Sequence, residues 1–507
     1  MRKIFLSAVA VTLIMPSMAK ADEAWVLQQG LNDYLKAQSL SSLMPDVAAE
    51  VKVKDDLTVI FPQTEIENVG FDDEGNVKTS SEIIPSYEAV AKISGDFLNN
   101  PRYKISTDSI DALRSQAYTR FSLSGVSASS FNQNMYFVPA LKALTGLNLN
   151  AQNIVLSSVD AKTNLKEEIA SVSDVIMSSE ISPSGNEANY TATWQIDNVN
   201  FKSPFVSVAV PRISSQINSV FKIDSTTDYN KLYADAAALK SSDSKVDLQN
   251  VSLDIMTGQK ISYNLQALGK ARLDEALNML KVSGASYITD LKVTGMDDFP
   301  LREVKLKYLL KDIDVAKIKN IQSQAEKLLE ISGSDDNDDL NEEQKQMVKQ
   351  LGDEVEDLTK TMQLKLQANL IFDQADAALL VALKKSGRYV VGNGDITITD
   401  LEKLVPDYAK LCEEEMKQGN SMPESCMKAG MSAMLYEYID TSKRTTNAKG
   451  QTVDKIEIVL NETGIYINNK KTAEPIEFDL NEMIAEMLTS SDSSGNSFDV
   501  SSDYEGL

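Results

Sequence analysis

One short pattern recurs four times in the chain and interrupts the alternation of a β-strand each time. It has the form apolar-x-Asn-apolar-x-apolar and occupies residues 66–71, 151–156, 196–201 and 248–253. In each copy, the apolar positions before the Asn are one residue out of phase with those after it. A one-residue slip moves every later side chain to the opposite face of a strand, and a β-bulge or bend is needed to restore the faces.

The Asn of each copy is the expected place of the bend, because Asn tolerates the left-handed conformation and can bond its own backbone. In the third copy we expect Trp194 and Phe201 to face the same core. The segment around Asp312 is an Asp variant that leads into a helix. The alternative is chance recurrence in a chain rich in Asn and Val. The predicted structural bulges are Asn68, Asn153, Asn198 and Asn250.

Alternating segments dominate from about residue 147, as at 190–196, 251–255 and 260–267. The clearest, 362–372, places apolar side chains on one face and polar ones on the other, which is typical of antiparallel sheets. Hairpins are expected around 71–76, at 251–267, within 389–398 and at 455–469. Helices are expected at 22–48, 86–98, 108–121, 268–281, 314–332, 341–362, 401–418 and 425–439.

Helices and strands do not alternate one for one, which argues against parallel βαβ layers. We therefore expect an α+β fold, with a long, twisted, mostly antiparallel β-sheet and inserted helices packed on one face. The predicted regions are a signal peptide at 1–21, an α+β region at 22–145, a strand-rich repeated region at 146–312, an α+β region with helical pairs and a closing hairpin at 313–489, and a disordered tail at 490–507.

The N-terminus has the layout of a secretory signal peptide. Arg2 and Lys3 precede an apolar run, and an Ala-x-Ala site ends at Ala21, directly before Asp22. The run is shorter than the roughly 20 residues that a membrane span needs. We expect cleavage between Ala21 and Asp22, a periplasmic or secreted protein, and no transmembrane segment after cleavage. An uncleaved N-terminal anchor is the alternative.

The composition excludes several classes of function. The chain has no His and two Cys in 507 residues, and its formal net charge is −24. Ser-His-Asp and Cys-His catalysis, His-based zinc sites, Cys-only zinc sites and iron–sulfur clusters are therefore excluded. The negative charge argues against nucleic acid as a partner. We expect no catalytic residue, no metal site and no cofactor.

The two cysteines, Cys412 and Cys426, lie in two predicted helices on either side of a short loop. In an oxidising compartment they are expected to form a disulfide across this helical hairpin. A redox-active pair is the alternative, although the spacing is not that of a C-x-x-C motif.

The acidic stretch 333–343 is the candidate for calcium binding. An EF-hand loop that begins at Asp335 would need Gly at its sixth position and Glu at its twelfth. The chain has Leu340 and Gln346 there. A solvated acidic linker is therefore predicted, with weak calcium binding near Asp335 as the alternative.

Two S-x-x-K tetrads, Ser219 to Lys222 and Ser425 to Lys428, lack the supporting motifs of the enzymes that use this pair. Carboxylates are abundant, so a glycosidase-like acid pair stays open, but nothing in the sequence selects two of them.

Residues 288–318, 390–407 and 463–471 carry a family resemblance. Their strand pair with an Asp-capped helix, their Gly-Asn-Gly segment and their closing hairpin resemble the YdgA-like family of bacterial envelope proteins of unknown function. The resemblance covers residues 245 to 475. It implies an envelope location and a non-catalytic, sheet-rich body, and it supplies no functional residues. A cleavable signal is a departure, because members of the family often look anchored.

The sequence is best interpreted as that of an exported, non-enzymatic envelope protein that binds a protein partner or an apolar or lipid ligand. The alternatives are a carboxylate-dependent periplasmic hydrolase and a calcium-responsive surface protein.

Overall fold

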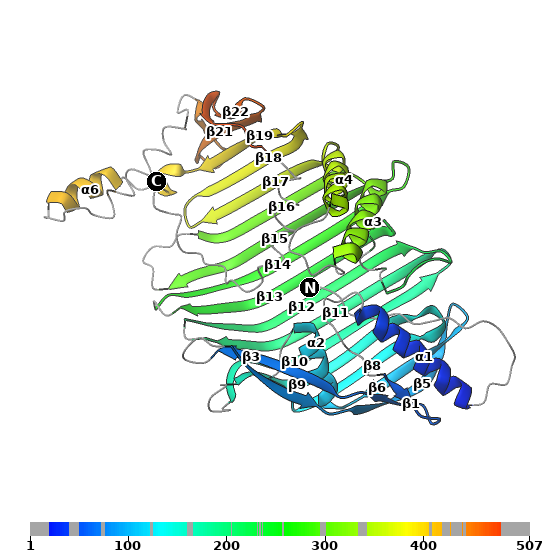
Figure 1. Cartoon of the computed structure of the whole chain (residues 1–507). Helices are drawn as coiled ribbons and strands as arrows, with labels where there is room; N and C mark the ends of the chain where they lie inside the picture. Colours follow the sequence, from blue (N-terminus) through cyan, green and yellow to red (C-terminus); the bar gives the residue numbers. More distant parts are fainter. Residues whose placement is uncertain are drawn as a thin grey trace. The chain divides into compact units, whose positions relative to one another are not determined.

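The structure is a computed structural model, shown in Figure 1. The residues it describes are 20–39, 50–71, 77–121, 125–159, 166–203, 205–230, 232, 235, 237–255, 258–294, 301–332, 342–404, 408–417, 426, 439 and 443–477. Residues 1–19 of the predicted signal peptide, residues 333–341 of the acidic stretch 333–343 and the predicted tail at 490–507 lie outside them.

The chain forms two compact units that are discontinuous in sequence. Unit 1 consists of Met1–Arg272, Gly284–Leu306 and Leu370–Asp373, and unit 2 consists of Leu273–Ser283, Lys307–Asn369 and Gln374–Leu507. Four strands contribute residues to both units. They are β14 (Lys260–Asp274), β15 (Met279–Thr294), β16 (Leu301–Asp314) and β17 (Gln363–Phe372).

Unit 1 contains α1 (Lys20–Ser39), α2 (Ile110–Phe121) and a 3-10 turn, η1 (Pro139–Leu141). Its short or medium strands are β1 (Lys52–Val53), β2 (Thr58–Phe61), β3 (Thr64–Phe71), β4 (Val77–Ile84), β5 (Tyr87–Phe97), β6 (Asn100–Thr107), β7 (Val126–Ser127) and β8 (Ser130–Val138). Its long strands are β9 (Ala143–Val159), β10 (Lys166–Ser184), β11 (Glu187–Lys202), β12 (Val206–Lys222) and β13 (Leu239–Ile255).

The strands of unit 1 form an antiparallel sheet in the order β1-β2-β5-β6-β8-β9-β10-β11-β12-β13-β14. β3 and β4 pair separately. From β8 onward, neighbours in the sheet are also neighbours in the sequence, and Figure 1 shows β9 to β13 side by side. The prediction of a mostly antiparallel β-sheet is confirmed.

The helices predicted at residues 86–98 and 268–281 do not form, and both segments lie mainly in β-strands. Residues 86–98 form β5, in which Ala89 and Ala91 are buried while Val90 between them is 46% exposed. Residues 268–281 form the end of β14, a turn and the start of β15. The Asp274 carboxylate accepts the backbone N–H groups of Ala276 and Leu277, which closes a turn where a helix was expected.

Unit 2 contains α3 (Val315–Ser332), α4 (Glu342–Thr359), α5 (Leu401–Leu404) and α6 (Tyr408–Lys417). Its own strands are β18 (Asp376–Ser386), β19 (Tyr389–Thr399), β20 (Thr445–Thr446), β21 (Thr452–Asn461), β22 (Gly464–Ile467) and β23 (Lys470–Ala473). They pair antiparallel in the order β18-β19-β21-β22-β23, with β20 also beside β21.

The hairpin predicted within 389–398 is instead one straight strand, β19. A Cβ atom on Gly392 would collide with the Ala382 carbonyl oxygen of β18. Glycine at this position therefore permits close approach of a neighbouring strand, and the turn lies at Gly387 (φ +58°) between β18 and β19.

A row of left-handed residues crosses the long strands of unit 1. The backbone φ angle is +49° at Asn153 in β9, +52° at Asn198 in β11 and +51° at Asn250 in β13. Asp290 in β15 has a φ of +54°. The four residues lie on alternate strands of the sheet. We call the row that they form the crease. Asp312, the Asp variant in β16, also has a positive φ of +61°.

Asn68 does not follow this rule. β3 pairs with β4 without a register shift from Thr64↔Ile84 to Phe71↔Val77, and Asn68 pairs directly with Ser80. The predicted bulge is therefore wrong at Asn68. At Asn153 and Asn198 the backbone is left-handed, but the pairing with the neighbouring strands shows no register shift, so of the four predicted bulges Asn250 is the one confirmed.

The crease reverses the alternation of side chains without changing the apolar face. On β9, Ala151 before Asn153 and Ile154 after it belong to one hydrophobic cluster with Ala112 of α2. In an uninterrupted strand, positions 151 and 154 would point to opposite faces. The left-handed residue between them therefore keeps both apolar side chains on one side of the sheet.

Side-chain hydrogen bonds run along the crease from strand to strand. The Asn198 amide donates to Ser173 Oγ of β10 at 2.9 Å, and Ser173 Oγ donates to the Asp197 carbonyl oxygen at 3.1 Å. On β13, Gln249 and Asn250 together oppose the single residue Asn264 of β14, which is a β-bulge.

Asn198 offers a test of the left-handed backbone. We expect Asn198→Val to lower the free energy of unfolding by about 1–2 kcal/mol, because a β-branched residue is strained at positive φ. Asn198→Gly should stay within about 0.5 kcal/mol of the wild type, since glycine adopts this conformation freely. Urea denaturation followed by circular dichroism measures both variants.

The matched control is Asn189→Val on the same strand, where the backbone is extended and the side chain is exposed. It should change stability by no more than about 0.5 kcal/mol. Equal losses at positions 198 and 189 would contradict a special backbone role for Asn198.

Candidate functional site

One face of the long strands carries a continuous apolar band. Residues paired across neighbouring strands share a face, so the face found for β9 extends through β10 to β14. Two rows of paired residues lie before the crease and one lies after it, and all their members are apolar except the buried Ser215. The rows are Leu149–Met177–Trp194–Ser215–Val246–Ala267, Ala151–Val175–Ile196–Ile213–Leu248–Leu265 and Leu156–Ala170–Phe201–Val208–Leu253–Ile261.

The band is only partly covered. Ala151 at its β9 end is fully buried beneath α2, and Val210 and Val251 beside the crease are 6% and 2% exposed. Most other members on β10 to β14 are half-buried. Phe201 is 38% exposed, so the closed core expected around Trp194 and Phe201 does not enclose Phe201.

The opposite face of the same strands is polar. Its rows near the crease contain mainly Ser, Thr, Asn, Gln and charged side chains, and the apolar exceptions include Val155, Ile176 (49% exposed), Ala209 and Leu268. Representative rows are Asn148–Ser178–Thr193–Gln216–Lys245 and Gln152–Asp174–Asp197–Arg212–Gln249.

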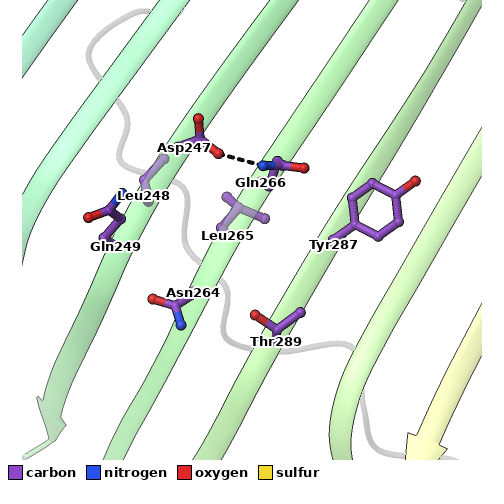
Figure 2. A pocket seen from close by; sticks show the side chains of 8 residues that line it. All are labelled: Asp247, Leu248, Gln249, Asn264, Leu265, Gln266, Tyr287 and Thr289. Atoms are coloured by element: carbon purple, nitrogen blue, oxygen red, sulfur yellow. Dashed lines mark hydrogen bonds between the residues drawn. The ribbon is translucent and has the colours of Figure 1, made fainter.

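A hollow of about 320 Å³ lies where the crease crosses β13, β14 and β15, and all of its lining residues belong to unit 1. Figure 2 shows its side chains on three neighbouring strands. They are Asp247, Leu248 and Gln249 of β13, Asn264, Leu265 and Gln266 of β14, and Tyr287 and Thr289 of β15. We call this site the polar hollow.

Asn264 joins the three strands beneath the polar hollow. Its amide oxygen accepts the backbone N–H of Asn250 at 2.7 Å, and its amide nitrogen donates to the Asp290 carboxylate at 2.8 Å. One side chain thus ties together two left-handed residues that lie two strands apart. The bulge of β13 is therefore hydrogen-bonded to a side chain that lines the polar hollow.

The Asp247 carboxylate is held on two sides. Gln266 donates to it at 2.7 Å, and Lys245 Nζ lies 2.7 Å from its other oxygen. Burial acts to raise the pKa of Asp247, but the hydrogen bonds from Lys245 and Gln266 bring that pKa below its ordinary value. The carboxylate is therefore ionised and paired at neutral pH.

Asp197, next to Asn198, is a second paired carboxylate on the polar face. Hydrogen bonds from the Arg212 guanidinium and then from the Gln195 amide lower the pKa of Asp197. The pair crosses from β11 to β12, so the charges of the polar face also link neighbouring strands.

The predicted disulfide between Cys412 and Cys426 is confirmed. The predicted cleavage position between Ala21 and Asp22 falls near the start of α1, which begins at Lys20. Ser219 is buried and shares a hydrogen bond with Ser242 Oγ at 2.8 Å. Residues 425 and 428 and residues 335–341 of the acidic stretch lie outside the described residues.

Asp290 and Asn264 were not predicted from the sequence. Residues 288–293 have the same slipped pattern as the four copies, with Asp in place of Asn. A search for either residue type would have found Asp290. Asn264 has no such signal, because its role depends on which strands become its neighbours.

No group of three His, Cys, Asp or Glu side chains that could hold a metal ion occurs within the described part of the chain. Among the same residues, no helix is both long and apolar enough to cross a membrane.

No protein-family model, no curated protein and no solved structure matches the chain. The function of the two faces of the sheet therefore has to be inferred from the side chains that they carry.

The depressed pKa of Asp197 gives a pH prediction. A carboxylate with a lowered pKa stabilises the fold above its unfolded pKa of about 3.9, and this contribution is lost as pH falls through the folded-state pKa. Between pH 6 and pH 3, the urea midpoint should therefore fall further for the wild type than for Asp197→Asn.

The control is Asp96→Asn, which changes an exposed carboxylate on β5 away from the crease. Its urea midpoint should fall between pH 6 and pH 3 by as much as that of the wild type. An identical acid response of Asp197→Asn and wild type would refute a stabilising role for the ionised Asp197.

Proposed function

We propose that this protein is an exported, non-enzymatic protein of the bacterial cell envelope that binds a lipid or similar apolar ligand along the apolar band. The observation that carries the proposal is the continuity of the band across β9 to β14. Single apolar residues scattered over a surface are normal, but here half-buried apolar side chains lie next to one another on six neighbouring strands. Contiguous apolar surface of this kind is typical of interaction sites.

The ligand is an extended one, because the band runs across the strands. Neighbouring strands lie about 4.8 Å apart, so the rows extend about 24 Å from β9 to β14. A hydrocarbon chain laid along them would gain about 0.8 kcal/mol for each buried CH₂ group. Trp194 and Ile196 lie near the middle of this path.

We further propose that the helices of unit 1 cover one end of the same face. Leu27 and Leu31 of α1 belong to a cluster with Leu147 of β9, and Ala112 of α2 belongs to one with Ala151. Positions 147 and 151 share a face by alternation. On this interpretation α1 and α2 close the β5–β9 part of the face, and the band is the part that they leave.

The periplasmic location rests on the basic, apolar and Ala-x-Ala segments of residues 1–21 and on the resemblance to the YdgA-like envelope family. The absence of His from the sequence and the paired state of Asp247 and Asp197 support binding rather than catalysis.

Tryptophan fluorescence tests lipid binding directly, because the chain has two tryptophans, Trp25 and Trp194. In Trp25→Phe, a nitroxide-labelled stearic acid should quench the remaining Trp194 in a saturable manner. In Trp194→Phe, the quenching of Trp25, which is 50% exposed on α1, should be much weaker. Quenching that does not saturate in Trp25→Phe would count against the proposal.

A pair of charge substitutions provides the matched control. In the Trp25→Phe background, Ile196→Glu places a carboxylate in the band and should reduce the affinity at least tenfold, whereas Thr193→Glu places it on the polar face of the same strand. Thr193→Glu should bind as the parent does. Equal affinities of the two variants, with circular dichroism unchanged, would show that the label binds elsewhere.

A further inference from the structure

We infer that the polar hollow binds a small neutral carbohydrate. Leu248 and Leu265 line the hollow and also belong to the apolar band, but the inference is argued from the polar lining residues Gln249, Tyr287 and Thr289 and does not rest on the proposed lipid ligand. Its volume of about 320 Å³ suits one or two sugar rings, at the lower end of the range for small-molecule sites.

The charge of the polar hollow favours a neutral ligand. Asp247 is the charged residue in its lining, and Lys245 and Gln266 already satisfy that carboxylate. A cationic ligand would have to displace Lys245, and an anionic ligand would meet the Asp247 carboxylate. Neither exchange is favourable for a group that is paired and partly desolvated.

Three lining side chains supply unused hydrogen-bonding groups. Gln249, Tyr287 and Thr289 lie around the hollow in Figure 2 and make no side-chain hydrogen bond to another described residue. Together they offer an amide and two hydroxyls, which can each donate and accept. A ligand rich in hydroxyl groups matches this mixture, whereas an apolar ligand would leave these groups unpaired.

The Tyr287 ring gives the hollow an amphipathic wall. An aromatic ring presents a flat apolar surface, and its hydroxyl keeps a polar end. The C–H face of a sugar ring and its hydroxyl rim have the same division into apolar and polar parts. Asn264, which also lines the hollow, links β13 to β15 through its hydrogen bonds to Asn250 and Asp290.

Saturation-transfer NMR on the full chain tests the inference, with maltose and N-acetylglucosamine as sugar probes and spermidine as a cationic probe. The hollow is open on one side, so a roughly millimolar dissociation constant is expected for the better sugar. Spermidine should give no saturable signal at this site.

The test variant is Tyr287→Phe combined with Gln249→Ala, which removes two unused groups and keeps the aromatic ring. It should weaken sugar binding at least fivefold while circular dichroism stays unchanged. The control is Tyr308→Phe, which alters a 39% exposed tyrosine outside the hollow and should bind as the wild type does.

Absence of a saturable signal from both sugars would overturn the inference. So would equal sugar affinities of the double variant and the wild type, or spermidine binding that the double variant weakens. The Ile196→Glu variant of the apolar band should retain sugar binding, which separates this outcome from any failure of lipid binding.

Discussion

The left-handed backbone at the crease is the constraint on which the sheet of unit 1 depends. An L-residue in this conformation costs about 1–2 kcal/mol, and Asn and Asp are the non-glycine residues that adopt it most readily. Three Asn residues and Asp290 occur at this place on alternate strands. Bonds such as Asn198 to Ser173 and Asn264 to Asp290 offset the cost, since they satisfy polar side chains across neighbouring strands.

The left-handed residues keep the apolar side chains on one face of strands that are up to 19 residues long. Without the slip, the apolar residues on the two sides of each Asn would point to opposite faces, and neither face would be consistently apolar. With it, the rows through Ile196 and Phe201 share a face, and polar side chains gather on the other. The apolar band and the polar hollow are therefore two consequences of the same backbone feature.

The sequence predicted the antiparallel sheet, the disulfide and a backbone irregularity at Asn153, Asn198 and Asn250, because each depends on local pattern or on residue chemistry, but a register shift occurs only at Asn250 of these three. It was wrong for β5 and for the turn between β14 and β15, where helix-forming residues are outweighed by pairing with neighbouring strands. The polar hollow could not be predicted. Asp247 and Asn264 become neighbours of Tyr287 only through the register of β13, β14 and β15.

The most direct test of the account is a nitroxide scan along β11, from position 193 to position 201, with one Cys introduced at a time. The native cysteines are paired with each other, so each variant has a single reactive thiol. Accessibility to a water-soluble relaxation agent should alternate up to position 197, slip once at Asn198, and then alternate again with Val199 resembling Ile196. Unbroken alternation through position 198 would contradict the crease and the single apolar face that follows from it.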